Sequence, residues 1–187
     1  MTRPNFTLTV VTSADGYIAR RPGESPATWA SVEEQALFFR DVDAADWAVM
    51  GRGTHEAAER PDRHRIVFST GTAGWRRPTQ LWLDPEGLTP DDLARRVADV
   101  RPMRTALILG GTRVHDWFMD RGAVDRVHLT VEPVTFGDGL PLLTGATGPA
   151  EDVLAARGFR IERDERLNDA GTRYLVLVPG GADERAD

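Results

Sequence analysis

The chain has 187 residues, of which 41% are hydrophobic and 28% charged, proportions that are ordinary for a globular protein and fit one domain rather than two. It contains no cysteine, which excludes disulfide bonds, a thiol nucleophile and a thiolate-bound metal. The net charge is −6 and all 23 basic residues other than histidine are arginine, so neither general attraction to nucleic acid nor lysine-based chemistry is expected.

The first half of the chain alternates predicted strands with predicted helices. Phe6–Thr12 alternates apolar and hydroxyl residues, which is typical of a strand. Ser31 has the character of a helix N-cap, and Glu33 and Glu34 in the next turn suit the helix dipole, so a helix is expected to about Asp41. Further strands are expected at 47–50, 65–68 and 80–83, with a brief helix at 55–59.

The second half continues this alternation and ends in a hairpin. Thr89-Pro90-Asp91-Asp92 combines a capping hydroxyl, a proline and two acids, which predicts a helix that ends near Val100. Later elements are expected as strands at 105–109 and 126–131, a helix at 112–120, a loop at 132–148 and a hairpin of 159–166 with 173–178. We expect one α/β domain over residues 1–179 and a disordered tail at 180–187.

No apolar run approaches the length needed to span a bilayer. Residues 1–5 lead directly into the first strand and lack the apolar stretch of a signal peptide. The four histidines show no metal-ligand spacing. We therefore expect a cytoplasmic protein that binds no metal, no membrane and no nucleic acid.

Two segments, Val49–Thr54 and Ile108–Thr112, join a strand end to a helix start through glycine. Glycine allows the phosphates of a ligand to approach the main chain, and the helix that follows offers free amides and a positive dipole end. Two such turns indicate a bound dinucleotide at the carboxyl ends of the strands, although Glu56 stands where the common fingerprint has its third glycine. The alternative interpretation is a pair of ordinary strand–helix connections.

These segments and their neighbours carry a family resemblance. The chain resembles the dihydrofolate reductase superfamily in five stretches that follow in order, Ser13–Ala19, Trp29–Phe39, Val49–Thr54, Arg65–Ser69 and Ile108–Val114. Residues 124–130, Pro133 and residues 136–143 look especially like the reductase domain of bifunctional riboflavin deaminase-reductases. The likeness extends from about Thr7 to Val178.

The resemblance implies a dihydrofolate reductase-like three-layer fold, with a central mixed, mostly parallel sheet of about eight strands flanked by helices. It implies a homodimer and NADPH, with NADH possible, as the hydride donor. The residues that it implies for the cofactor are Gly51, Arg52, Gly53, Thr54, Ser69, Thr70, Gly110, Gly111, Thr112, Arg113 and Val114. Arg52 and Ser69 would contact the adenosine 2′-phosphate, and Gly110–Val114 would line the pyrophosphate, with a cis peptide between the two glycines.

Two carboxylates are candidate proton donors, Glu34 before Asp15. Glu34 precedes Phe38 by one helical turn, the spacing with which dihydrofolate reductases anchor a pterin beside an aromatic ring, although aligning Phe39 instead puts Gln35 at the anchor. Asp15 would lie in the loop that closes over the nicotinamide and the substrate. The alternatives are that Glu34 is a solvated first-turn acid and that Asp15 only stabilises its turn.

Trp29, Phe38 and Glu132 are candidates for substrate binding. Trp29 could stack on a planar heterocycle, but an aromatic residue before a helix more often packs as a staple. Glu132 could be a site carboxylate, but an exposed residue at a strand end is the favoured interpretation. Leu109 stands where riboflavin-pathway reductases have Glu, and the deaminase half is absent.

Together these features predict an NAD(P)H-dependent reductase that transfers a hydride to a C=N or C=O group of a small heterocycle, which would be pterin-like, pyrimidine-like or a natural product. The alternative is a non-catalytic dinucleotide-binding or regulatory protein that retains the reductase fold.

Overall fold

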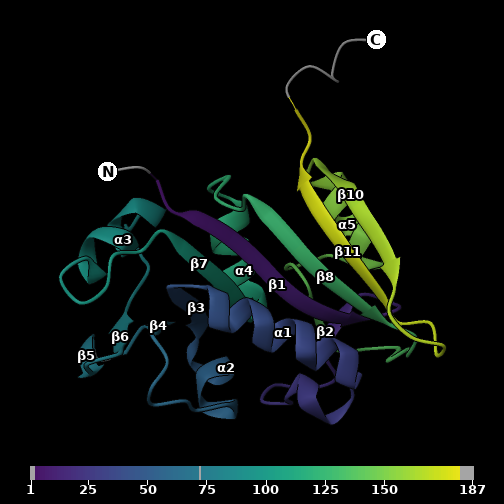
Figure 1. Ribbon diagram of the computed structural model, residues 1–187, viewed down its shortest axis with the longest axis horizontal. Coiled ribbons are helices and arrows are strands. Elements are labelled where there is room, and N and C mark those ends of the chain that lie inside the picture. The colour runs from purple at the N-terminus through teal and green to yellow at the C-terminus, as the bar shows by residue number, and fades with distance from the viewer. Residues whose placement is uncertain (1–2, 72, 182–187) are drawn as a thin grey trace.

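The computed structural model describes residues 3–71 and 73–181, and over these residues nine strands form one sheet. Its strands are β1 (Asn5–Ser13), β3 (Trp47–Gly51), β4 (Arg65–Phe68), β5 (Gly74–Arg77), β6 (Gln80–Leu83), β7 (Thr105–Gly110), β8 (Arg126–Glu132), β10 (Phe159–Arg166) and β11 (Arg173–Pro179). Their order across the sheet is β10-β11-β8-β1-β7-β3-β4-β6-β5 (Figure 1). β2 (Tyr17–Ala19) and β9 (Leu140–Pro141) pair as a small antiparallel sheet.

The six strands from β8 to β6 are parallel, and the hairpin β10–β11 joins them in the antiparallel sense. This confirms the predicted mostly parallel mixed sheet with an antiparallel C-terminal hairpin. The ninth strand is β5, which pairs with the edge of β6 and is exposed along its length. Its sequence, Gly-Trp-Arg-Arg, lacks the apolar alternation by which the other strands could be predicted.

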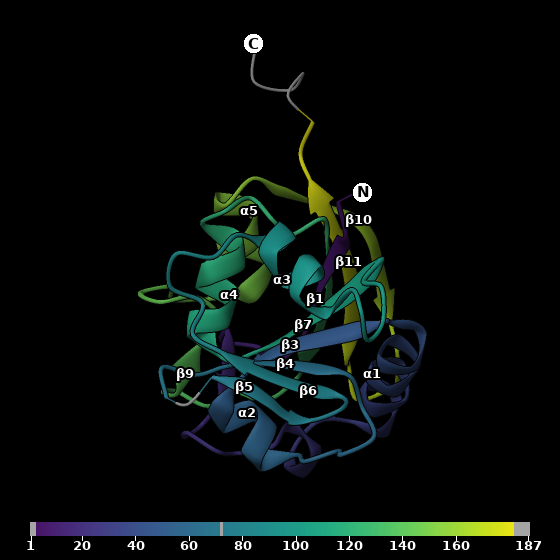
Figure 2. The ribbon, with the colours of Figure 1, turned by 90° about the vertical axis from the view of Figure 1, so that its left-hand side faces the viewer.

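Helices cover both faces of the sheet. They are α1 (Val32–Ala44), α2 (Arg52–Ala57), α3 (Pro90–Val97), α4 (Thr112–Met119) and α5 (Ala150–Ala156), with a 3-10 turn η1 at Pro26–Thr28. α1 and α2 lie on one side of the sheet, and α3, α4 and α5 lie on the other (Figure 2). The three-layer arrangement follows, with the parallel strands in the middle.

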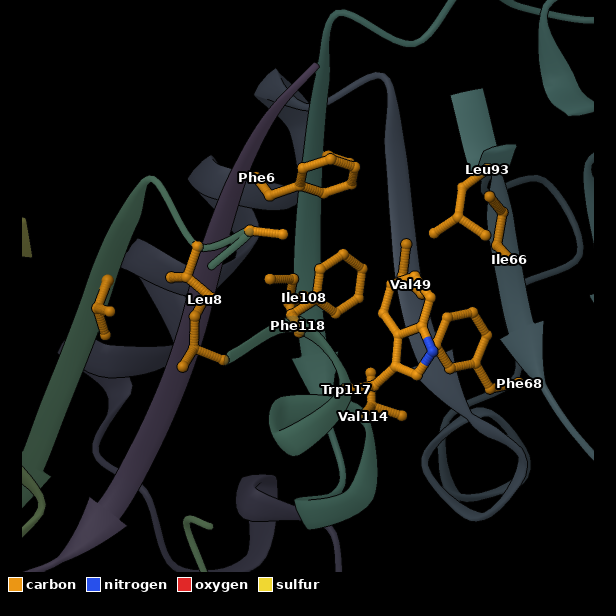
Figure 3. Close-up of a cluster of buried hydrophobic side chains, with 14 of the residues drawn as sticks. Phe6, Leu8, Val49, Ile66, Phe68, Leu93, Ile108, Val114, Trp117 and Phe118 are labelled. Carbon is orange, nitrogen blue, oxygen red and sulfur yellow. The ribbon is translucent and has the colours of Figure 1, made fainter. Parts of the chain in front are cut away.

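The main hydrophobic core fills the space between the sheet and the helices α3, α4 and α5. Phe6, Leu8 and Ile108 point from the central strands toward Phe118 of α4, and Leu93 of α3 closes the cluster (Figure 3). All five side chains are fully buried. Burying each such side chain stabilises the fold by roughly 1.5–3 kcal/mol, so this face carries most of the apolar stabilisation.

The opposite face holds a much smaller apolar cluster. Ala48, Met50 and Leu107 of the sheet meet the half-buried Val42 and Ala45 at the end of α1. Polar contacts add to the attachment of α1. Asp41 accepts a 2.5 Å hydrogen bond from His128 of β8, and Asp43 forms an ion pair with Arg63, whose N···O distance is 2.6 Å.

Several element boundaries differ from the sequence expectation. α2 begins at Arg52 rather than near residue 55, because Gly51 adopts the extended N-cap conformation. The segment predicted as a loop at 132–148 contains β9, and α5 was not predicted. Residues 182–187 of the predicted disordered tail lie outside the described residues.

Candidate functional site

A cleft of about 780 Å³ lies between the sheet and the helices α1 and α2. Residues of the central strands line it as a floor, among them Thr9, Val11, Ala48, Met50 and Leu107. The wall from α1 includes Glu34, Gln35, Phe38, Phe39 and Val42. Gly53, in the first turn of α2 just after β3, and Gly110 and Gly111 at the end of β7 also line the cleft, near the carboxyl ends of the strands, where ligands of parallel α/β sheets bind.

Glu34 and Glu132 are buried near one another at the start of α1. Only 6% of Glu34 and 4% of Glu132 is exposed. Glu132 accepts a 2.7 Å hydrogen bond from the backbone N–H of Ser31 and another of 2.7 Å from the Thr172 hydroxyl. The favoured interpretation of Glu132 as an exposed residue is therefore wrong, because two partners distant in sequence enclose it.

The Glu34 carboxyl lines the cleft, and no hydrogen bond holds it among the residues that the structure describes. Burial, with the nearby charge of Glu132 as a second cause, raises the pKa of Glu34 from 4.5 to about 7. This excludes the interpretation of Glu34 as a solvated first-turn acid. A carboxyl with a pKa near 7 can be protonated at neutral pH and can give up that proton.

Asp15 does not line this cleft. Its carboxylate accepts hydrogen bonds from the Ser13 hydroxyl at 2.7 Å and from the backbone N–H groups of Phe136 and Gly137 at 3.1 and 2.7 Å. Burial alone would raise the pKa of Asp15, but these hydrogen bonds outweigh it and lower the pKa. The structure thus places Asp15 as a residue that joins the turn after β1 to the loop after β8.

The first glycine turn brings Gly53 and Thr54 to the cleft. A Cβ atom built on Gly53 would meet no heavy atom within 4 Å, so the backbone there is open. Arg52 points outward, with 65% of its side chain exposed and an ion pair to Glu56 at 3.7 Å. Gly51 lies beneath, where a Cβ would contact Val114 at 3.6 Å.

The second glycine turn joins β7 to α4. Gly110 and Gly111 line the cleft, and the peptide bond between them is cis. Gly111 is the N-cap of α4 and makes no side-chain capping bond, so no side-chain cap satisfies the first amides of this helix. Thr112 is engaged elsewhere, because its hydroxyl donates to the Pro141 carbonyl at 2.7 Å.

Seven of the expected cofactor residues are not among those that line the cleft: Gly51, Arg52, Ser69, Thr70, Thr112, Arg113 and Val114. Ser69 and Thr70 follow β4 at the carboxyl edge of the sheet, and the Ser69 hydroxyl accepts a hydrogen bond from the N–H of Gly71 at 3.3 Å. Arg113 is exposed on α4. Val114 is buried in the main core, close to Gly51 of the first glycine turn.

Of the two aromatic candidates for substrate binding, one lines the cleft and the other does not. Phe38 lines the cleft one turn after Glu34. Trp29 packs edge-to-face on Phe136 with 5.0 Å between the ring centroids, and it is not among the residues that line the cleft. Its indole Nε1 is buried without a partner among the described residues. The packing interpretation of Trp29 fits this placement better than stacking on a substrate.

A buried cation of the cleft was not predicted from the sequence. Arg65 begins β4 and lines the cleft, yet only 7% of it is exposed. The available signal was a charged residue at the first position of an otherwise apolar strand. It is ambiguous, because such a residue is usually solvated, and only the fold of α2 over β4 buries it.

Among the residues at 3–71 and 73–181, no cluster of three or more potential metal ligands occurs. In the same part of the chain, no helix has both the length and the apolar character that a membrane span requires.

Comparison with known proteins decides the family. The sequence matches the RibD C-terminal domain over residues 4–167. The chain belongs to the RibD C-terminal domain family. No curated protein matches the sequence at a significant level.

Two solved structures share the fold. A riboflavin biosynthesis protein from Shewanella sp. PV-4 is 17% identical with a TM-score of 0.66, over 93% of this chain and 98% of that one. The diaminohydroxyphosphoribosylaminopyrimidine deaminase/5-amino-6-(5-phosphoribosylamino)uracil reductase from Thermotoga maritima is 19% identical with a TM-score of 0.70. The match covers 95% of this chain but 57% of the Thermotoga chain. Membership of the RibD C-terminal domain family supports a pyridine-nucleotide-dependent reductase.

Proposed function

We propose that the protein is an NADPH-dependent reductase of a C=N or C=O group in a small, flat heterocycle, with Glu34 as its proton donor. The observation that carries this proposal is the Glu34 carboxyl, which is buried, faces the cleft and has a pKa of about 7. Family membership supports the reaction class. The substrate class rests on the acid, the aromatic ring of Phe38 and the apolar floor.

The glycine turns fit a dinucleotide. A Cβ at Gly53 or at Gly111 would meet nothing within 4 Å, so the backbone at both positions is open to a close-lying group. Gly111 leaves the N-terminus of α4 without a side-chain cap, which suits an anion. Arg52 has a largely exposed guanidinium that is available to a 2′-phosphate.

In this proposal different residues would bind the cofactor, orient the substrate and donate the proton. Gly53, Gly111 and Arg52 would hold the cofactor, which when bound supplies a hydride to an electrophilic carbon. Phe38 and the apolar floor would orient the ring and exclude water. Glu34 would hold a proton at its carboxyl oxygen and donate it to the heteroatom next to the reduced carbon.

A non-catalytic nucleotide-binding protein is the alternative. An intact cofactor site beside a purely apolar pocket would favour this alternative. The buried acid at Glu34 favours the enzyme instead. Leu109, which lines the cleft, supplies no polar group, so we expect negligible turnover of the ribosylaminopyrimidine of the riboflavin route.

The test is NADPH oxidation by the wild type and by Glu34→Gln with dihydrofolate, the riboflavin intermediate and simple cyclic imines. We expect turnover of a flat imine or pterin that falls by about 100-fold in Glu34→Gln. Full activity of Glu34→Gln would remove Glu34 as the donor. Rapid turnover of the riboflavin intermediate would overturn the argument from Leu109, and tight NADPH binding with no turnover of any substrate would favour the alternative.

A further inference from the structure

The face of α1 that meets the sheet carries two buried acids. Of the 13 residues of this helix, all of which the structure describes, only Glu34 and Asp41 are buried. They are separated by about two helical turns, so they lie on the same face of the helix. Val32 and Phe39 are instead 74% and 46% exposed. Burial of apolar side chains therefore does not by itself decide which face of α1 is turned toward the sheet.

The strand β8 presents one residue to each of these acids. His128 and Glu132 are both on β8 and an even number of positions apart, so their side chains lie on the same face of the sheet. His128 Nδ1 lies 2.5 Å from the carboxylate of Asp41, and the charge of Glu132 acts on Glu34. Because an ionised carboxylate only accepts hydrogen bonds, Nδ1 of His128 is the donor.

The pairing makes the two acids chemically different. Burial alone would raise the pKa of Asp41, but hydrogen bonds from His128 and Arg40 outweigh it and lower the pKa. Arg40 donates to Asp41 at 2.8 and 3.1 Å and to the Tyr174 hydroxyl at 3.4 Å. Glu34 has no comparable donor among the described residues, and its pKa is about 7. One acid of this helix face is thus an anchored anion, and the other keeps a proton.

The other titratable and charged groups near His128 lie on β11 and β10. Tyr174 of β11 packs edge-to-face on His128, with 5.8 Å between the ring centroids. Arg163 of β10 acts on Tyr174, but it is paired with Glu165. Within the described part of the chain, Asp41 is the one carboxylate that contacts the imidazole. The position of His128 is therefore tied to that of α1.

We propose that His128 is a positioning residue that acts on Glu34 through Asp41. Its hydrogen bond holds the second half of α1 on β8, while the hydrogen bond from Ser31 to Glu132 of the same strand holds the start of the helix. A helix that is held at both ends keeps one rotation about its axis, and this rotation keeps Glu34 buried at the cleft. The inference rests on the proposed function in taking Glu34 as the proton donor.

The experiment measures the titration of Glu34 by carbon-13 NMR in the cofactor-free protein. Glutamate is labelled at the side-chain carboxyl, and the signal of Glu34 is identified by its absence from Glu34→Gln. In the wild type we expect a midpoint at about pH 7. His128→Phe keeps an aromatic ring beside Tyr174 but loses the donor. Its midpoint should fall by about half a pH unit or more, because α1 loosens and water reaches the carboxyl.

The direction of the shift separates position from charge. Loss of the partner that compensates Asp41 leaves more negative charge near Glu34, which by itself would raise the pKa of Glu34. A fall in the midpoint therefore reports reduced burial of the carboxyl rather than an altered charge. An unchanged or raised midpoint in folded His128→Phe overturns the proposal.

Further variants assign the effect to one hydrogen bond. His128→Asn places an amide N–H near the position of Nδ1, so it should restore most of the wild-type midpoint. Tyr174→Phe keeps the ring beside His128 and removes only the 3.4 Å contact with Arg40, so it should leave the midpoint unchanged. If His128→Phe does not fold, His128→Gln replaces it, because its amide lies near the position of Nε2. A midpoint as low in His128→Asn or Tyr174→Phe as in His128→Phe overturns the assignment to Nδ1.

These outcomes are separate from those of the proposed function. Full activity of Glu34→Gln would remove Glu34 as the proton donor, but it would not alter the effect of His128 on the titration. Equally, a titration that does not respond to His128 leaves Glu34 as the donor.

Discussion

The carboxylate of Glu132 at the end of β8 accepts a 2.7 Å hydrogen bond from the backbone N–H of Ser31, the residue that caps α1. The same Ser31 accepts a hydrogen bond from the N–H of Glu34 at 3.3 Å. One buried carboxylate thus fixes the helix start that carries the other. The proximity that follows is a cause of the raised pKa of Glu34, second to burial.

The first prediction concerns stability and pH. The pKa of Glu34 is about 7 in the folded protein and 4.5 without the fold. A raised folded pKa means that the carboxyl stabilises the fold fully below about pH 4.5 and loses this contribution as the pH rises through about 7. Glu34→Gln stays neutral, so we expect it to gain up to about 3 kcal/mol relative to the wild type near pH 9 and little near pH 4.

Urea unfolding between about pH 4 and pH 9 measures this gain in stability, with Glu33→Gln as the control. The pKa of Glu33 is lowered, chiefly by its hydrogen bond from Asn168, so its contribution is present at high pH. Removing that carboxylate should give no gain in alkaline solution. A Glu34→Gln difference that does not change with pH would contradict the buried, titrating carboxyl.

The second prediction separates the charge of Glu132 from its hydrogen bonds. Glu132→Gln keeps an amide oxygen for the Ser31 N–H but removes the charge beside Glu34. The pKa of Glu34 should fall, and the loss of kcat at alkaline pH should begin at a lower pH than in the wild type. Thr172→Val keeps the charge and loses one hydrogen bond, so it should lower stability by about 1 kcal/mol without this shift in the profile.

The third prediction concerns cofactor choice. Arg52 is exposed, and among the described residues its one ion pair is a 3.7 Å contact with Glu56, so it is available to a 2′-phosphate. Arg52→Ala should weaken NADPH binding by roughly 1.5–3 kcal/mol and NADH binding much less, as measured by cofactor fluorescence. Equal losses for both cofactors would remove Arg52 from the phosphate site.

The fourth prediction compares the two glycines of the second turn. A Cβ at Gly111 would meet no heavy atom of the described residues within 4 Å, so Gly111→Val should keep the melting temperature within a few degrees while it abolishes NADPH binding. Gly110 has a φ of +106° and a Cβ there would lie 3.2 Å from His115 Nε2, so Gly110→Ala should destabilise the fold itself. Unchanged NADPH affinity in a folded Gly111→Val protein would make the turn merely structural.

The fifth prediction is a homodimer. β10 forms one edge of the large sheet and exposes Ile161, which leaves an unpaired strand edge for a second copy. Sedimentation or light scattering at micromolar concentrations should give twice the mass of one chain. A monomer mass at all concentrations would rule this out.

The sequence predicted those elements whose signals are local. The alternation in β1, the Ser31 cap of α1 and the proline start of α3 each act within a few residues, and the structure confirms them. The strand β5 was not predictable in this way, because its exposed polar residues are ordered only by pairing with β6. A local sequence pattern predicts a helix or strand when the interactions that stabilise the element come from its own residues.

The residues of the site also divide into those with a local sequence signal and those placed by distant segments. Glu34 and Phe38 lie one helical turn apart on α1, and both line the cleft, as Gln35 and Phe39 of the alternative alignment do. Glu132 could not be placed, because its partners lie 101 and 40 residues away. Arg65 is buried by Ala58 and His55 of a segment that folds back over its strand. Burial created by distant segments leaves no periodic pattern in the sequence.

The cleft and the main core lie on opposite faces of the same sheet. Residues that shape the cleft on α1, such as Gln35, Phe38 and Phe39, make no contribution to the packing around Phe118 and Leu93. Substitutions on this helix can therefore change which molecules fit while the melting temperature is set elsewhere. In an evolving family or in a directed-evolution library, such a layout lets substrate preference vary with little penalty in foldability.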